Sequence, residues 1–123
     1  MVHYNTEHKT VLDELLLDQP FVRAGKMFGY PAYYAEKKLC ICLYEEGVGI
    51  KIPEKTAQQL LETDPNAIPF QPMGKPKMRE WIQINLHQSQ DYRQYLPLFQ
   101  ESIHYLLEQQ KITFTELKEE YKS

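Results

Sequence analysis

Residues 39–52, LCICLYEEGVGIKI, consist of two extended segments joined by a Glu-Glu-Gly turn. In the segment Val48–Ile52, apolar side chains alternate with Gly49 and Lys51. This alternation is typical of a strand with one buried face and one face toward solvent or a partner. The segment Leu39–Tyr44 is apolar at every position, which predicts a central strand buried on both faces. The turn is too short for a crossover, so the two strands are expected to be antiparallel neighbours.

The central segment holds both cysteines of the chain, Cys40 and Cys42. Their i, i+2 spacing predicts that both side chains share one face of the strand, opposite Leu39, Ile41 and Leu43. A disulfide between them would be strained. A structural zinc site needs four ligands, and none of the four histidines has zinc-finger spacing to these thiols. We therefore expect two free thiols, no bound metal and no cofactor.

The segments before residue 39 predict one helix followed by more strands. Residues 6–17 place their aliphatic side chains at helical spacing, with Asn5 as the N-cap and a stop before Pro20. Two extended segments follow, Val22–Phe28 and Ala32–Ala35, separated by Gly-Tyr-Pro. Short connections of this kind again indicate antiparallel strands.

The segments after residue 52 predict a helix, a loop, a strand and a longer helix. Pro53 is expected at the first position of the second helix. The prolines of Asp64–Pro76 make that segment a loop or an edge strand. Period-two alternation over Trp81–Leu86 predicts a strand. The longer helix is expected over Gln90–Gln109, where Pro97 either kinks it or stands close to its start.

Thr113 and Glu116 form a capping box, which predicts a short terminal helix. The expected fold class is therefore α+β: an antiparallel sheet with helices packed on one face, in the order α-β-β-β-(β)-α-β-β-α, plus this short helix. The length of 123 residues suits a single domain. We expect a core over residues 1–110 and a C-terminal helical extension over residues 111–123.

Composition argues against two classes of partner. Fourteen Lys and Arg against seventeen Asp and Glu give a formal charge of −3, so no global positive field attracts nucleic acid. No apolar run approaches the roughly 18 residues of a membrane span, and the N-terminus does not resemble a signal peptide. We expect a cytoplasmic protein without a membrane or nucleic-acid partner.

Enzyme motifs are missing from the sequence. No serine lies in a nucleophile elbow, and Gly47-Val48-Gly49 lacks the third glycine and the following helix of a dinucleotide fingerprint. His3, His8 and His104 have no positioned carboxylate partner in the sequence pattern, which favours surface histidines. We expect no catalytic residues.

A basic run in the proline-rich loop leads directly into the only tryptophan, and cations beside aromatic rings are common in binding sites. The alternative is that these charges are simply solvated. The strand that follows places Trp81 and Gln83 on its outward face, away from Ile82 and Ile84. The expected contact surface comprises Met73, Lys75, Lys77, Arg79, Trp81, Gln83, Lys51 and Lys26. Trp81 is the expected centre, unless it packs under the loop and only stabilises the fold.

Five short motifs together resemble the TfoX N-terminal domain family: Lys26-Met27-Phe28-Gly29, Val48-Gly49-Ile50-Lys51, Pro69-Phe70, Pro72-Met73-Gly74-Lys75 and Trp81 at the start of a late strand. The resemblance covers roughly residues 15–109. It implies an α-β-β-β-α-β-β-α layout, similar to type III secretion chaperones and the MmcQ/YjbR group. The family's named member is a competence regulator, and the resemblance supplies no catalytic residues.

These observations favour a non-enzymatic interaction or regulatory module that binds a protein partner or a second copy of itself. The rival hypothesis is a small-molecule binder or small enzyme, in which Lys26, Lys51 or Arg79 neutralises an anion. A DNA-binding regulator is a third hypothesis, suggested by the family resemblance and opposed by the acidic net charge.

Overall fold

The computed structural model describes residues 2–110 of the chain. It confirms the predicted α+β class and element order, with four strands before the second helix. The predicted terminal helix lies in residues 111–123, outside the described residues. The elements are α1 (Thr6–Leu16), β1 (Val22–Met27), β2 (Tyr30–Ala35), β3 (Lys38–Tyr44), β4 (Gly47–Lys51), α2 (Glu54–Thr63), β5 (Ala67–Pro69), the 3-10 turn η1 (Pro72–Gly74), β6 (Trp81–Ile84), the 3-10 segment η2 (Ser89–Tyr95) and α3 (Leu96–Gln109).

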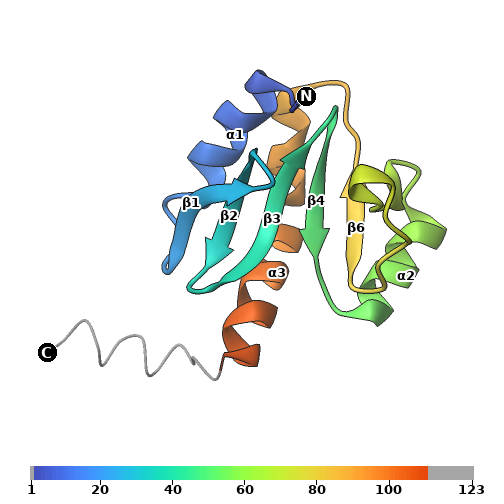
Figure 1. The fold of residues 1–123 in the computed structure, drawn as a ribbon. Helices are drawn as coiled ribbons and strands as arrows, with labels where there is room; N and C mark the ends of the chain where they lie inside the picture. Colours follow the sequence, from blue (N-terminus) through green and yellow to red (C-terminus); the bar gives the residue numbers. More distant parts are fainter. Residues whose placement is uncertain (1, 111–123) are drawn as a thin grey trace, which may run out of the picture.

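The strands form one sheet in the order β1-β2-β3-β4-β6-β5, and every neighbouring pair is antiparallel. Figure 1 shows α3 passing behind the sheet and α2 beside β6. The proline-rich segment contributes both structures that the sequence allowed, since β5 is a short edge strand and a loop follows it. This loop, residues 70–80, connects the edge strand β5 to its neighbour in the sheet, β6.

The helix ends follow the sequence signals closely. The Asn5 side chain accepts hydrogen bonds from the backbone N–H groups of Glu7 and His8, as an N-cap does. Pro53 is the N-cap residue of α2 and not its first helical residue, so that prediction is one position off. Pro97 lies in the first turn of α3, where its missing N–H breaks no helical bond. The helix therefore begins beside this proline and is not kinked by it.

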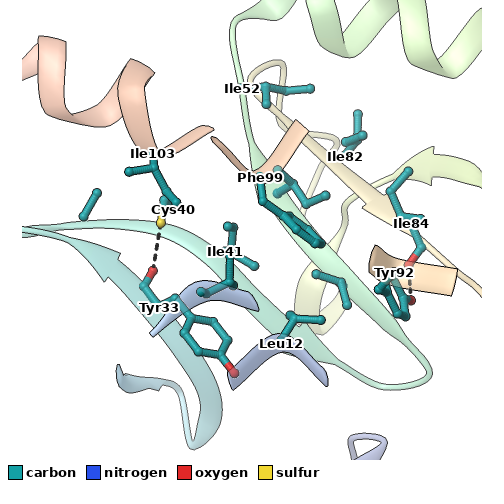
Figure 2. Packing of buried hydrophobic residues seen from close by; sticks show 14 of the residues in the cluster. Leu12, Tyr33, Cys40, Ile41, Ile52, Ile82, Ile84, Tyr92, Phe99 and Ile103 are labelled. Carbon is teal, nitrogen blue, oxygen red and sulfur yellow. Dashed lines mark hydrogen bonds between the residues drawn. The ribbon is translucent and has the colours of Figure 1, made fainter. Parts of the chain in front are cut away.

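The main core lies between the sheet and the helices. Side chains from α1, α3, β3 and β6 meet there, among them Leu12, Phe99, Ile41 and Ile84, all fully buried (Figure 2). Burial of each such side chain contributes roughly 1.5–3 kcal/mol to folding. The Tyr92 hydroxyl, also inside this core, donates a hydrogen bond of 2.8 Å to the Ile84 carbonyl. The predicted inward positions of β4 and β6 are confirmed by this packing.

A β-bulge at Cys40 overturns the prediction that the two cysteines share a face. Tyr33 pairs with Ile41 and Tyr34 with Leu39, so Cys40 is an extra residue without a partner in β2. Its thiol turns toward the helices and donates to the Tyr33 carbonyl at 3.3 Å (Figure 2). Leu39 is thereby moved to the opposite face, where Cys42 also lies. The extra residue interrupts the two-residue period on which the prediction depended.

Both thiols are free, fully buried and on opposite sides of the sheet. Burial raises the pKa of Cys40 and of Cys42 to about 12, so little thiolate forms near neutral pH. We expect a chromogenic thiol reagent at pH 8 to label the native protein at least about a hundred-fold more slowly than the protein in denaturant. Denaturant should expose two reactive thiols. Rapid labelling of either thiol in the native protein would show that its face of the sheet is open.

Candidate interaction surface

The face of the sheet away from the helices carries a second, smaller apolar cluster. Ala32, Cys42, Phe70 and Trp81 are its buried members. Around them pack the partly buried side chains of Met27, Tyr34, Leu39, Tyr44 and Met78. We call this group the outer cluster. Because Phe70 and Met78 belong to the loop of residues 70–80, this loop lies against the outer face of the sheet.

Gly49 makes room for the loop. A Cβ atom at this position would lie 2.9 Å from the Phe70 ring and 3.1 Å from the Cys42 sulfur. The Phe70 ring therefore rests directly over the backbone of β4. Aromatic contacts extend on both sides of it, with ring centroids 5.6 Å away at Tyr44 and 5.2 Å away at Trp81.

Two further contacts fix the outer part of the loop. The Met73 backbone N–H donates to the Tyr44 hydroxyl at 2.9 Å. The Lys75 ammonium lies 4.9 Å from the centroid of the Phe28 ring, in cation–π contact. Phe28 belongs to the β1–β2 turn, so the loop reaches a hairpin more than forty positions earlier in the sequence.

The predicted centre of the contact surface is buried. Trp81 lies on the outer face as predicted, but only 9 % of its surface is exposed, and Gln83 is 8 % exposed. The Phe70 ring packs against Trp81, and the Gln83 amide donates to the Asn85 side chain at 2.9 Å. The structure thus supports the alternative interpretation, in which Trp81 packs under the loop. The outward-facing positions of β6 were predicted correctly, but the loop that packs over them was not.

The predicted cations do not gather at one place. Lys26 shares a face of β1 with Val22, which packs on the helical core, so its side chain points away from the outer cluster. Lys51 is half-buried beside Trp81, and its ammonium lies 4.0 Å from the Glu80 carboxylate. Neither residue is a free cation of the outer surface.

The basic run itself splits in two directions. Lys75 turns toward Phe28, whereas Lys77 and Arg79 line an open hollow of about 460 Å³ beside α2. Glu54, Ala57, Gln58 and Leu61 line its other side. A carboxylate inside this hollow reduces its attraction for an anion. The three cations are all exposed.

Phe28 was not among the predicted contact residues, yet it is the most exposed of the large apolar side chains on the described surface. Its exposure is 62 %, and that of Met73 is 60 %. Both have left-handed backbone, with φ of 50° and 56°, and each precedes a left-handed glycine. The Phe28-Gly29 pair closes a two-residue hairpin turn, where Asn-Gly or Gly-Gly is usual. A phenylalanine at a turn position that favours Asn or Gly is the sequence signal that could have revealed this exposed side chain.

We use the name hairpin–loop surface for Phe28, Met73 and Lys75 together with the next cations of the loop, Lys77 and Arg79, which lie farther along it at the hollow beside α2. The outer cluster supports it from below. β1 beside it is an edge strand, but the Tyr34 ring passes over Gly25 and its hydroxyl donates to the Lys26 carbonyl at 2.8 Å. Part of the strand edge is therefore already occupied.

His8 is buried, which corrects the expectation of a surface histidine. Its Nδ1 lies 2.5 Å from the Ser89 hydroxyl, and its ring meets Tyr92 edge-on. Burial lowers its pKa. Ser89 is itself 9 % exposed, so this hydrogen bond joins α1 to η2 inside the fold.

The described residues contain no group of three His, Cys, Asp or Glu side chains placed to hold a metal ion. Among residues 2–110, no helix is long and apolar enough to span a membrane. Comparisons with protein-family models, curated proteins and solved structures found nothing that matches this chain.

Proposed function

We propose that the protein is a non-enzymatic interaction module that binds a protein partner through the hairpin–loop surface. One observation carries this proposal: Phe28 and Met73 expose most of their apolar area from left-handed backbone positions. Left-handed backbone costs a non-glycine residue roughly 1–2 kcal/mol, and the exposed area gains nothing in the isolated chain. Unfavourable conformations of this kind are often found where a protein binds something. Of the five described non-glycine residues with left-handed backbone, Phe28 and Met73 are the two that expose a large apolar side chain.

The surface is also held in place before any partner arrives. The Tyr44 hydroxyl fixes the Met73 backbone, and Lys75 stacks on Phe28. A preorganised surface loses less conformational entropy on binding. Aromatic residues, methionine and arginine are enriched at protein interfaces, and this surface contains all three.

A small-molecule site is less well supported. The hollow beside α2 is open and includes Glu54 among its lining residues. Lys26 and Lys51, the other cations considered for an anion site, lie elsewhere. Ligand sites usually enclose most of the ligand in a concave, largely apolar pocket, which this hollow does not provide.

The motifs behind the family resemblance support a related proposal, that the chain is a domain of the TfoX N-terminal type. Lys26–Gly29 and Pro72–Lys75, which are far apart in the sequence, meet through the contact between Phe28 and Lys75. The described order differs by one strand, because four strands precede α2 where the family layout has three.

Replacing Phe28 with Asn tests the proposed function. Asn suits the left-handed position before Gly29, a gain of roughly 1–2 kcal/mol. The lost contact with Lys75 costs roughly 0.5–1 kcal/mol, so the variant should be more stable by about 1 kcal/mol. For a domain of this size the melting temperature should rise by roughly 3–6 °C. Binding should weaken at the same time, because an exposed aromatic anchor is removed. The measurements are thermal unfolding and affinity capture of proteins from the native host, with wild type and variant side by side.

Glu36→Asn is the matched control. Glu36 has φ of 55° at the β2–β3 turn, the opposite end of β2 from Phe28. This variant relieves a similar backbone strain and should gain stability while retaining every wild-type partner. If Phe28→Asn also retains every partner, the surface does not bind protein and the proposal is wrong.

A further inference from the structure

The two segments that form the hairpin–loop surface have a charge opposite to that of the chain. Residues 20–31 and 67–79 contain Arg23, Lys26, Lys75, Lys77 and Arg79 and no Asp or Glu. The whole chain has a formal charge of −3, so its negative charge lies in the other segments. Folding brings the two basic segments together where Lys75 contacts Phe28.

The cations of this surface are available to a partner. Among the described residues, the ion pairs engage His3, Lys9, Lys51 and Arg93. None of these is on the hairpin–loop surface. Lys75 is already positioned by the Phe28 ring, so a carboxylate that approaches Lys75 also approaches an exposed apolar side chain.

From this arrangement we infer that the partner is an acidic protein segment, in which Asp or Glu residues flank one or two large apolar side chains. The inference rests on the proposed function. The apolar side chains would pack on Phe28 and Met73, where desolvated contacts supply most of the affinity. One carboxylate would face Lys75 beside Phe28, and carboxylates farther along the segment would face Lys77 and Arg79 at the hollow beside α2. Charge complementarity there supplies specificity and a fast association rate.

A second copy of the chain fits this surface less well. A two-fold dimer places the same patch of both subunits face to face. Here that pairing would set cations against cations, and like charges across an interface oppose association. Pairing with an acidic helical face of another copy would be heterologous and would not close into a dimer.

Nucleic acid is also a weaker match. Its affinity for a protein grows with the number of phosphates neutralised at once. The surface offers three cations that form no ion pair within residues 2–110, and they point in two directions. Phe28 and Met73 are its most exposed apolar side chains. An acidic peptide uses both the charges and the apolar side chains.

Peptide display tests the inference with the full chain as bait. Short random peptides are selected in parallel against the wild type and against Lys75→Glu/Lys77→Glu. Wild type should enrich peptides with Asp or Glu beside Leu or Phe. The charge-reversed variant should lose these peptides and enrich Lys or Arg instead. A synthetic copy of a wild-type peptide should bind the variant at least about ten-fold more weakly.

Lys37→Glu/Lys38→Glu is the matched control, since it makes the same change of charge at the β2–β3 turn. It should select the same peptides as the wild type. If the selected peptides depend on Phe28 and Met73 but contain no excess of Asp or Glu, the inference of an acidic partner is wrong and the proposed function is still supported. If no selected peptide depends on Phe28, both are wrong. Binding of duplex DNA at physiological salt that is lost in Lys75→Glu/Lys77→Glu would assign the surface to nucleic acid and overturn the inference.

Discussion

Trp81→Ala is expected to lower the free energy of unfolding by about 3–5 kcal/mol, as large truncations in a core do. Trp81 is 9 % exposed and packs beside Phe70 on the outer face of the sheet. Its removal leaves a cavity under the loop of residues 70–80, which the neighbouring rings fill only in part. The total free energy of unfolding of a domain is about 5–15 kcal/mol. The melting temperature should therefore fall by roughly 10 °C or more. Thermal and denaturant unfolding measure this directly.

Two variants bracket that result. Trp81→Phe retains a ring against Phe70 and should lose less stability than the alanine variant. Met73→Ala removes a side chain that is 60 % exposed, and it should change stability by no more than about 0.5 kcal/mol. A Trp81→Ala protein as stable as the wild type would mean that the outer cluster does not hold the loop. The hairpin–loop surface would then lack its support.

Gly49→Ala is expected to destabilise the protein by about 1–3 kcal/mol, although alanine has the better backbone propensity. In a strand interior, glycine is less stable than alanine by roughly 0.5–1 kcal/mol, so propensity alone predicts a gain. Packing predicts a loss, because the new Cβ would lie 2.9 Å from the Phe70 ring and 3.1 Å from the Cys42 sulfur. The sign of the change in the free energy of unfolding therefore shows whether backbone propensity or the packing clash is the larger effect.

The Phe70 ring is the group that must move, so its removal should relieve the clash. We expect Gly49→Ala to cost much less in a Phe70→Leu background, with a coupling of about 0.5–3 kcal/mol in the double-mutant cycle. Trp81 is the only tryptophan, and its ring centroid lies 5.2 Å from that of Phe70. Its fluorescence should shift in Gly49→Ala as the ring is displaced. Additive losses and an unchanged spectrum would contradict the packing of Phe70 over Gly49.

The two stability predictions bear on function because the outer cluster lies beneath the binding surface. Phe70 and Met78 belong to the same loop as Met73 and Lys75. Loosening the outer cluster should therefore weaken binding as well as folding. Phe28→Asn differs from both variants, since it should weaken binding while stabilising the fold. The opposite signs separate a contact residue from a supporting one.

Local sequence patterns determined the elements of this fold. The alternation in Val48–Ile52 and in Trp81–Leu86 predicted which side chains of β4 and β6 face the helices, and the packing confirms it. Asn5 marked the start of α1, whereas Pro97 left open a kink or a helix start, and the structure shows the start. These signals depend on residues within a few positions of one another, where helical and strand periods act directly.

Only the tertiary structure decided what covers the outer face. An outward pattern of Trp81, Gln83 and Asn85 fits both an exposed face and a face under a loop, and the proline-rich loop has no period that reveals its path. The bulge at Cys40 arises from the register of β3 against β2, so it was invisible within β3 itself. The hairpin–loop surface depends on a contact between Phe28 and Lys75. Contacts at such separation are set by how the whole chain packs, because no local pattern encodes which of two distant segments will meet.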